Sequence, residues 1–222
     1  MSGSSNRQVL LKARPEGIPQ ADHFEVVETA LPRVGEGEIL VRNAFLSVDP
    51  AMRGWVSAVA NYSEPVAIGA VMRSIAVGRV LDSRHPDYQS GDWVCGMFGW
   101  QDYALSDGSD VWFKHGFEDL PVSTSLGILG INGITAYHGL LDAGRPKAGD
   151  TVVVSTAAGA VGSAVGQIAH IQACRTVGIT STAEKIALCR DVYGFDAAIS
   201  YRSGDLDAAL AEACPAGSAL AD

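Results

Sequence analysis

The sequence predicts an α/β protein with two parts, a β-rich first part and a second part in which strands alternate with helices. Up to about residue 120, short apolar or alternating runs are separated by turn-forming segments. From residue 151 on, apolar runs of strand length alternate with helical patterns, which is typical of a parallel sheet covered on both faces. A stretch rich in glycine and apolar residues begins near residue 123 and marks the change of character.

The first part is expected to be a small barrel or sandwich, because short strands with turn signals between them are typical of both. The expected strands cover residues 8–13, 23–31, 38–48, 74–83, 92–97 and 101–106. The turn formers RPEGIP and PRVGEGE separate the first three runs. Residues 51–69 have no clear period, so we interpret them as a long functional loop with room for one helical turn.

The second part is expected to be a doubly wound parallel sheet. Residues 136–143 form a helical pattern, which Gly144 and Pro146 end. Strands are then expected at 151–155, 175–180 and 197–201, and helices at 160–172 and 183–193. The alternation gives about three parallel strands.

Composition excludes several classes of function. The 222 residues carry a formal net charge of −9 without a basic stripe, which makes the chain a poor partner for nucleic acid. No apolar run approaches the roughly 20 residues that a membrane helix needs. The polar start MSGSSNRQ lacks the apolar segment of a secretory signal. We therefore expect a cytoplasmic protein with no nucleic-acid or membrane partner.

The cysteines and histidines predict no metal site. The four cysteines form no C-x-x-C pair and match no zinc spacing, and the five histidines are scattered. We expect buried or idle thiols in a reducing compartment. The cysteines are Cys95, Cys174, Cys189 and Cys214.

The stretch VVVSTAAGAVGSAVGQIA, residues 152–169, carries the main functional signal. A dinucleotide-binding turn must be tight, bring the backbone close to a pyrophosphate and point the N–H groups of the next helix at that anion. The turn reads A-x-G-x-x-G, with alanine in place of the usual first glycine. Gly159 permits the close approach, Gly162 lets helix and strand pack closely, and Gly166 extends that packing by one turn. The candidate cofactor residues here are Ala158, Gly159, Ala160, Val161 and Gly162.

The end of the second strand of this α/β pattern favours NADP over NAD. An enzyme that selects NAD usually places an acidic residue there to bond the ribose 2′-hydroxyl, whereas this strand ends in Thr180 and Ser181. Lys185 follows at the start of the next helix, where its ammonium can meet a 2′-phosphate. Glu184 is a competing signal, but glutamates are common in first helical turns because of the helix dipole. The alternative interpretation of Lys185 is an exposed lysine without a ligand.

With these residues in place, the chain resembles the zinc-free medium-chain dehydrogenase/reductase superfamily. Within it, the chain is similar to the branch of leukotriene dehydrogenase/prostaglandin reductase, curcumin reductase and plant alkenal double-bond reductases. The motifs that carry the resemblance are NRQVLL, LSVDPAMRGW, GITAYHGLLDAG, STAAGAVGSAVGQIA, AEK and GFDAAISYRSGDL. The resemblance implies a GroES-like β-barrel domain, residues 1–122, followed by a truncated Rossmann doubly wound parallel sheet, residues 123–222. It also implies NADPH-dependent reduction of the C=C bond of α,β-unsaturated aldehydes and ketones.

The resemblance implies roles for single residues. Lys185 and Tyr201 match positions that contact the 2′-phosphate end of NADPH, and Thr135 lies in the segment near the nicotinamide. Zinc-dependent relatives have a cysteine near Ser47 and a cysteine-rich lobe near residues 85–115, where this chain has Cys95 alone. Neither zinc site can be built from these residues, so the resemblance implies a zinc-independent enzyme.

The group that supplies the proton is left open by the sequence. Members of the family often have a tyrosine where this chain has Ala51. Tyr62 is the remaining phenol of the corresponding loop and matches a family position tied to activity, with a packed aromatic as the alternative. Arg53 is a candidate for binding a polar substrate end, although an ion pair with Asp49 is the favoured interpretation.

The resemblance further implies that the chain stops before the family pattern is complete. Family members continue after CPAG, residues 214–217, with a strand that carries an Asn-Val-Gly-Gly turn. We therefore expect an uncovered sheet edge, weak NADPH binding, slow turnover and self-association as a homodimer. The alternative functions are a zinc-free quinone oxidoreductase and an NADP-binding protein without turnover.

Overall fold

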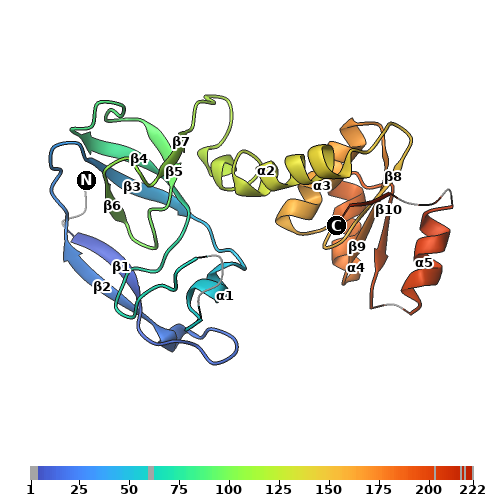
Figure 1. Cartoon of the computed structure of the whole chain (residues 1–222), viewed down its shortest axis with the longest axis horizontal. Coiled ribbons are helices and arrows are strands. Elements are labelled where there is room, and N and C mark those ends of the chain that lie inside the picture. The colour runs from blue at the N-terminus through green and yellow to red at the C-terminus, as the bar shows by residue number, and fades with distance from the viewer. Residues whose placement is uncertain (1–4, 60–62, 203, 216, 218, 222) are drawn as a thin grey trace. The chain divides into compact units, whose positions relative to one another are not determined.

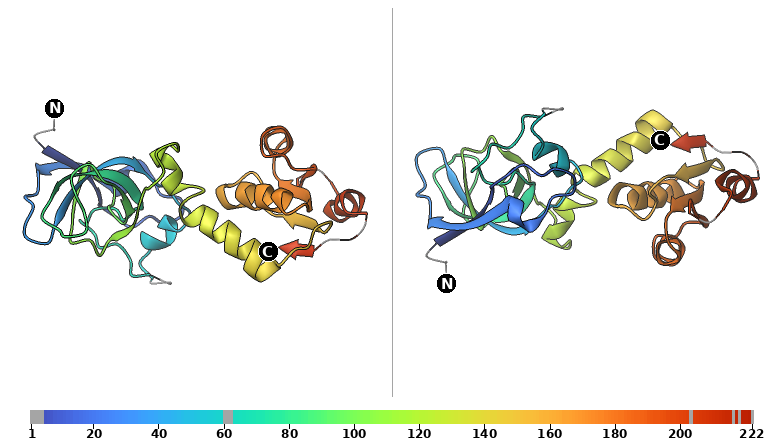
Figure 2. Two further views of the ribbon diagram at one scale, coloured as in Figure 1. Left: turned by 90° about the horizontal axis from the view of Figure 1, so that it is seen from above. Right: turned by 90° about the horizontal axis from the view of Figure 1, so that it is seen from below.

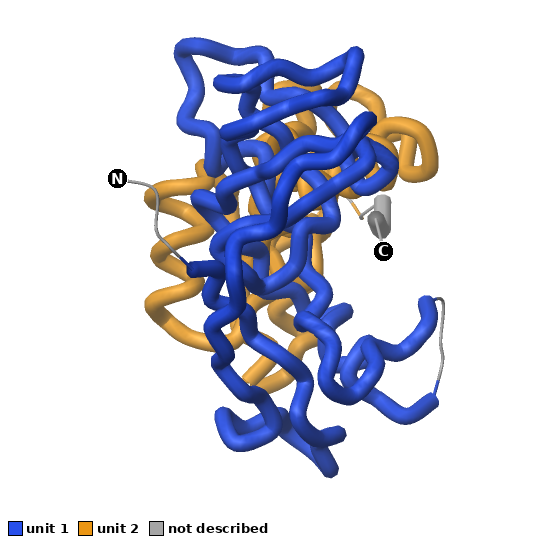
Figure 3. Tube along the Cα trace, turned by 90° about the vertical axis from the view of Figure 1, so that its left-hand side faces the viewer, with its two compact units in different colours: residues 1–126 blue, residues 127–222 orange. Residues whose placement is uncertain are grey.

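The chain folds into two compact units, residues 1–126 and 127–222, in the computed structural model (Figure 3). The structure describes all residues except 1–4, 60–62, 203, 216, 218 and 222. Each unit has a hydrophobic core of its own. No helix in the described part of the chain is long and apolar enough to cross a membrane.

The first unit is built from antiparallel strands (Figures 1 and 2). A two-stranded sheet pairs β1 (Ser5–Leu11) with β2 (Phe24–Ala30), and the 3₁₀ turn η1 (Ala21–His23) precedes β2. A five-stranded sheet has the order β6-β3-β4-β5-β7. Its strands are β3 (Ile39–Leu46), β4 (Ala76–Ser83), β5 (Trp93–Gly96), β6 (Tyr103–Ser106) and β7 (Val111–Lys114). The six strands expected from the sequence are confirmed, with slightly shifted ends.

Strand β7 was not predicted. It has the four-residue sequence VWFK, which is too short for a period of two to stand out. Its pairing with β5 is made possible by Gly96, because a Cβ at that position would lie 2.2 Å from the carbonyl oxygen of Asp110. The strand therefore depends on a close backbone approach that the local pattern does not reveal.

The segment 51–69 holds one helical turn, as expected, and this turn is α1 (Met52–Trp55). Met52 and Trp55 are buried in a cluster with Leu11 of β1, so the turn packs on the core of the first unit. Burial of these side chains fixes the orientation of α1, because apolar contacts with the core would be lost if it rotated.

Arg14 ties the two sides of this segment together. Its guanidinium donates to the carbonyl oxygens of Val56 at 3.2 Å, Ser57 at 2.8 Å and Val66 at 2.9 Å. The backbone N–H of Val66 also donates to the carbonyl of Trp55 at 2.8 Å. The described ends of the segment are thus held close together by one side chain and one backbone bond.

The second unit contains a parallel sheet in the order β10-β9-β8-β11. Its strands are β8 (Thr151–Val154), β9 (Arg175–Thr180), β10 (Ala197–Ser200) and β11 (Ala219–Ala221). The strands at 151–155, 175–180 and 197–201 were expected and are confirmed. This order runs outward from β8 in both directions, which is the first part of a Rossmann sheet.

The expectation of three parallel strands is wrong, because β11 pairs in parallel with β8 in the register Ala219↔Val152. On this side the described sheet therefore ends at β11 and not at β8. The segment around β11 is rich in alanine, which has a low intrinsic preference for strands. Pairing with β8 specifies the strand, and that contact is non-local.

The helices of the second unit cover both faces of its sheet. In Figures 1 and 2, α3 (Ala160–Ile171) and α5 (Leu206–Ala213) lie on opposite sides of the strands. The expected helix 183–193 is present as α4 (Ala183–Ala187) followed by the π-helical turn η4 (Leu188–Val192). Helix α5 was not predicted, although Asp205 caps it by accepting from the N–H groups of Asp207 and Ala208.

The glycine-rich connection between the sheets is helical over a longer stretch than expected. The 3₁₀ turn η2 (Val122–Leu126) ends the first unit. Helix α2 (Ile131–His138) then begins five residues before the predicted start at 136 and continues as the π-helical turn η3 (Gly139–Gly144). Arg145 ends it in the left-handed conformation, at φ 49°.

Candidate functional site

The turn between β8 and α3 is held to its surroundings by backbone bonds. Thr156 adopts the left-handed conformation at φ 50°, which is uncommon for a β-branched residue. The N–H of Gly159 donates to the carbonyl of Thr156 at 2.7 Å, and the N–H of Ala157 donates to the carbonyl of Ile179 at 3.0 Å. The second bond fixes the turn to β9, so its shape is set by the sheet.

The two glycines of the turn allow tight packing of the loop against the start of α3. A Cβ on Gly159 would lie 3.0 Å from both Cγ2 and the carbonyl oxygen of Thr156. A Cβ on Gly162 would lie 2.5 Å from the same carbonyl oxygen and 3.0 Å from Cα of Ala157. The first turn of α3 therefore lies directly against the loop, and the second contact leaves no room for a side chain.

Gly166 has a different role from the predicted one. A Cβ there would lie 2.1 Å from the ring of Phe195, which precedes β10, and the nearest contacts of Gly166 are all with this ring. A Cβ on Gly178 of β9 would lie 3.2 Å from Cδ1 of the same ring. Phe195 is buried in the core of the second unit, at 4% exposure. The two glycines thus make room for an aromatic ring between α3 and β9.

The start of α3 has the properties of an anion site. Its N-cap is Gly159, which has no side chain. No capping side chain therefore accepts a hydrogen bond from the first N–H groups of the helix. These groups and the helix dipole favour a negative charge at this point. The helix begins at the carboxyl end of β8, where the sheet order reverses between β9 on one side and β11 on the other. Ligands of open α/β sheets bind at this kind of position.

The carboxyl ends of β9 and β10 are joined by hydrogen bonds. The N–H of Tyr201 donates to the carbonyl of Thr180 at 3.0 Å, and the hydroxyl of Ser200 donates to the carbonyl of Ser181 at 3.2 Å. Helix α4 packs against both strands and carries Lys185 in its first turn. These bonds bring the candidates Thr180, Ser181, Lys185 and Tyr201 to one edge of the sheet.

Exposure separates these four candidates. Tyr201 is 52% exposed and Lys185 is also exposed, so both side chains can meet a ligand. Thr180 is only 4% exposed, so it supplies the shape of the edge and not a free hydroxyl. Thr182 caps α4 by accepting from the N–H of Lys185 at 3.3 Å.

Glu184, the competing signal of the sequence, is engaged with its own helix. Its carboxylate accepts from its own backbone N–H and from the hydroxyl of Thr182, and these bonds lower its pKa from the ordinary value. A first-turn glutamate that bonds the helix start is stabilised in its charged form. This geometry agrees with the dipole interpretation of Glu184.

Arg202 is a residue of this edge that sequence reasoning missed. Its guanidinium carbon lies 5.6 Å from the ring centroid of Tyr201, and its backbone N–H donates to the hydroxyl of Ser200 at 3.1 Å. The motif YRSGDL places it directly after Tyr201, but adjacency alone did not reveal that its side chain turns toward the ring.

Thr135 and the start of α3 belong to the same unit. Thr135 is exposed on α2, and α2 packs against α3. A groove of about 590 Å³ lies between these helices, and Ala160 is part of its lining. Its other lining side chains are mainly apolar or small, with Asn132, Ser163 and Gln167 as the polar ones.

The catalytic candidates of the first unit are less clearly placed. Arg53 is exposed on α1. Its expected ion pair with Asp49 is wrong for the described structure, because the Asp49 carboxylate accepts from the Ser47 hydroxyl at 2.7 Å and forms no ion pair with Arg53. Tyr62 lies outside the described residues.

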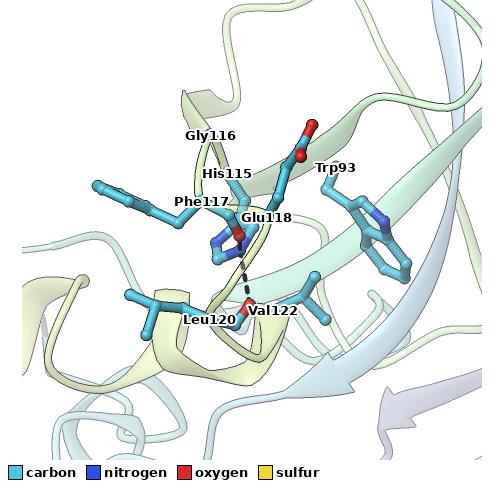
Figure 4. Close-up of a pocket in the computed structure, with 7 residues that line it drawn as sticks. All are labelled: Trp93, His115, Gly116, Phe117, Glu118, Leu120 and Val122. Carbon is cyan, nitrogen blue, oxygen red and sulfur yellow. Dashed lines mark hydrogen bonds between the residues drawn. The ribbon is translucent and has the colours of Figure 1, made fainter.

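The first unit also has a pocket of about 400 Å³ around His115 (Figure 4). His115 Nε2 bonds the carbonyl oxygens of Phe117 at 2.9 Å and Leu120 at 3.2 Å, and these can only accept. Nε2 therefore carries the proton, and Nδ1 accepts from the hydroxyl of Ser125 at 2.9 Å. Because every ring nitrogen is used within the fold, His115 ties the loop to η2.

No site for a metal ion is formed by the described residues, among which no three His, Cys, Asp or Glu side chains cluster. Cys95 is fully buried and donates to the carbonyl of Ser125 at 3.6 Å. Burial raises the pKa of the Cys95 thiol to about 11, so it is protonated at neutral pH. The thiol acts as a packing residue of the first unit.

Comparison with known proteins agrees with this arrangement. Residues 7–113 match the family described as the N-terminal domain of oxidoreductase. The chain is 48% identical over 212 residues to the NADPH-dependent curcumin reductase of Escherichia coli. The matched region covers 96% of the chain and 61% of that protein. It is 39% identical over 218 residues to the NADP(+)-dependent 2-alkenal reductase of Nicotiana tabacum. This match covers 96% of the chain and 64% of that protein.

A solved structure has the same fold. The crystal structure of CurA from Vibrio vulnificus in complex with NADPH matches with a TM-score of 0.86 and 43% identity, over 96% of this chain and 63% of that one. The chain thus spans about three fifths of the length of the relatives it matches. Over the part of their length that it spans, the chain is therefore similar in sequence and fold to the curcumin, alkenal and prostaglandin reductases, with an antiparallel GroES-like unit followed by the first part of a Rossmann sheet.

Proposed function

We propose that the chain is part of an NADPH-dependent oxidoreductase that reduces the C=C bond of α,β-unsaturated aldehydes and ketones. In this proposal, residues 1–122 form the substrate domain and residues 123–222 form the N-terminal part of the NADP-binding domain. The observation that carries it is the turn between β8 and α3, with an uncapped helix start at the reversal of the strand order.

The proposed cofactor contacts follow from this turn. Residues Ala158 to Gly162 surround the pyrophosphate, which the backbone N–H groups at the start of α3 bind, and Gly159 allows its close approach, because the turn is tight and carries no capping side chain. Thr135 of α2 faces the nicotinamide. Lys185 and Tyr201 bind the 2′-phosphate, and Thr180 and Ser181 form a floor that has no carboxylate to repel it.

When bound, NADPH supplies the hydride for the β-carbon of the conjugated double bond. The protein then stabilises the negative charge that develops on the carbonyl oxygen, and hydrogen-bond donors aimed at that oxygen contribute most to this. In the proposal, Arg53 binds a polar end of the substrate, since its side chain is exposed and forms no ion pair within the described residues. Tyr62 supplies a proton from its phenol.

The proposal extends to partners and location. We infer a zinc-independent cytoplasmic homodimer that acts on a small molecule and has no nucleic-acid or membrane partner. The net charge of −9 supports the exclusion of nucleic acid. The cysteines of the described chain are all unpaired, which suits a reducing compartment.

The test is an assay of NADPH consumption at 340 nm with a panel of enals, enones and quinones, combined with calorimetric titration of NADPH and NADH. Consumption with enals and tighter binding of NADPH support the proposal. Turnover with quinones alone identifies a quinone oxidoreductase, and NADPH binding without turnover on any substrate, both in this chain and in a version extended to the length of its relatives, identifies a binding protein. Equal affinity for both cofactors contradicts the choice of NADPH.

A further inference from the structure

Tyr201 and Arg202 form a preassembled pair at the edge of the parallel sheet. The guanidinium of Arg202 lies over the Tyr201 ring, at 5.6 Å from its centroid. A guanidinium placed over an aromatic face is attracted by the ring quadrupole and loses less freedom when it later binds an anion. Both residues are exposed, so the pair faces solvent.

The backbone of the pair is fixed to the strand that carries the acid-free tip. Tyr201 donates its N–H to Thr180 at 3.0 Å, and Arg202 donates its N–H to the hydroxyl of Ser200 at 3.1 Å. The same hydroxyl donates to Ser181 at 3.2 Å. The backbone of the pair is therefore held at the edge where β9 and β10 end.

The charge of Arg202 is not neutralised within the described residues, because no ion pair involves it. Two acidic residues of the segments that adjoin this edge, Glu184 and Asp205, have other partners. Glu184 is bonded to the start of α4, and Asp205 accepts from the N–H groups that open α5. An exposed guanidinium without a carboxylate partner is available for a phosphate, which it can bind with two parallel N–H bonds.

We propose that Arg202, placed over the Tyr201 ring, is a specificity-determining residue that binds the 2′-phosphate of NADP(H) together with Lys185. This inference rests on the proposed function, since it assigns a further ligand to the same cofactor. Lys185 contributes a point charge on a flexible stem, and Arg202 contributes a planar donor whose direction the ring sets. The discrimination between NADP and NAD is then shared between two cations.

The test compares two ligands that differ only in the 2′-phosphate, adenosine 2′,5′-bisphosphate and 5′-AMP, by titration calorimetry at low salt. For Arg202→Ala we expect the affinity for the bisphosphate to fall about tenfold, or about 1.4 kcal/mol, while the affinity for 5′-AMP stays within about twofold. Arg202→Lys keeps the charge but loses the planar fork, so an intermediate loss of about threefold is expected.

Arg33→Ala is the matched control, because it removes one exposed positive charge from the first unit. It should leave both affinities unchanged. Circular dichroism of each variant verifies the fold, which an exposed side chain at 202 should not disturb.

Three results would overturn the inference. If Arg202→Ala keeps full affinity for the bisphosphate while Lys185→Ala loses it, Lys185 acts alone and the proposed function stands. If Arg202→Ala weakens both ligands equally, the residue supports the adenosine part and not the phosphate. If the unmodified chain binds both ligands equally well, the NADP assignment itself fails, and the role of Arg202 fails with it.

Discussion

The two ends of the proposed cofactor site are built in different ways. At the turn between β8 and α3, the shape comes from the backbone, with glycines pressed against Thr156 and Ala157. At the edge formed by β9 and β10, the chemistry comes from the exposed side chains of Lys185, Tyr201 and Arg202. A change at the first place alters the fold, whereas a change at the second alters the ligand and leaves the fold intact.

This difference separates affinity from selectivity. The pyrophosphate is common to NAD and NADP, so a rigid backbone turn can bind both. The 2′-phosphate distinguishes them, and the residues proposed to bind it tolerate substitution because they are not packed. Selectivity can therefore change within such a site by surface substitutions alone.

The largest effect is expected for Gly162→Ala. The new Cβ would lie 2.5 Å from the Thr156 carbonyl oxygen, which is backbone and cannot rotate away. Overpacking of this kind costs about 3 kcal/mol, and the gain in helix propensity returns about 1 kcal/mol, so the net loss of stability is about 2 kcal/mol. The displaced helix start should also weaken NADPH and NADH binding equally.

Urea unfolding and calorimetric titration measure both parts of this prediction. Ser163→Ala is the control, because it lies one residue further along the same helix and its hydroxyl makes a bond of 3.3 Å to Ala160 within that helix. Normal stability and normal nucleotide affinity in Gly162→Ala would show that the turn has more freedom than its contacts indicate.

The next effect is expected for Lys185→Ala, which acts on selectivity alone. Loss of a charge-assisted contact should weaken NADPH binding about tenfold, or about 1.4 kcal/mol, and leave NADH binding nearly unchanged. Lys147→Ala, at an exposed lysine in a loop of the same unit, is the matched control. If calorimetry shows equal losses of affinity for NADPH and NADH, Lys185 does not bind the 2′-phosphate.

A smaller effect is expected in the first unit for Arg14→Ala. The change removes three bonds to the carbonyls of Val56, Ser57 and Val66, but water can reach part of the site because Arg14 is only half-buried. We expect a loss of stability of about 1 kcal/mol, measured by urea unfolding against Arg33→Ala. An unchanged midpoint would mean that the core contacts of α1 hold the segment without the arginine.

The smallest effect is expected for Asp102→Asn, which breaks the exposed ion pair with Arg7 at 2.7 Å. Hydrogen bonding to Arg7 lowers the pKa of Asp102, so its stabilising contribution is present above the unfolded pKa of about 3.9 and is lost as the pH falls through the lower folded pKa. Thermal unfolding should separate variant and parent slightly at pH 7 and not at all near pH 2. A separation that persists at pH 2 would point to a packing effect.

Most of the fold could be predicted from the sequence because periodicity and turn residues mark its elements. The alternation in the first unit and the α/β rhythm of the second predicted every strand longer than four residues in the described chain. The strands that were missed, β7 and β11, are short and depend on their partners. Long-range pairing specifies them, and a local pattern does not record it.

Sequence motifs predicted the candidate residues that lie next to one another in the chain. They did not predict the side-chain contacts that depend on the folded structure. The turn from Ala158 to Gly162 and the position of Lys185 follow directly from the motif after β8 and the start of α4. The hydrogen bonding of Glu184 at the start of α4 and the placement of Arg202 over the Tyr201 ring depend on side-chain direction. Rotamers are set by the folded surroundings, so residue type and spacing did not reveal them.

The ring of Phe195 has a consequence for how this sequence can vary. It fills the space that Gly166 and Gly178 leave open, and both glycines contact the ring within 3.5 Å when a Cβ is added. A larger residue at 166 therefore requires a smaller one at 195, and neither substitution is tolerated well alone. We expect these positions to change together in an evolving lineage, so that the interior of the nucleotide-binding unit keeps a constant volume while the residues on its surface drift.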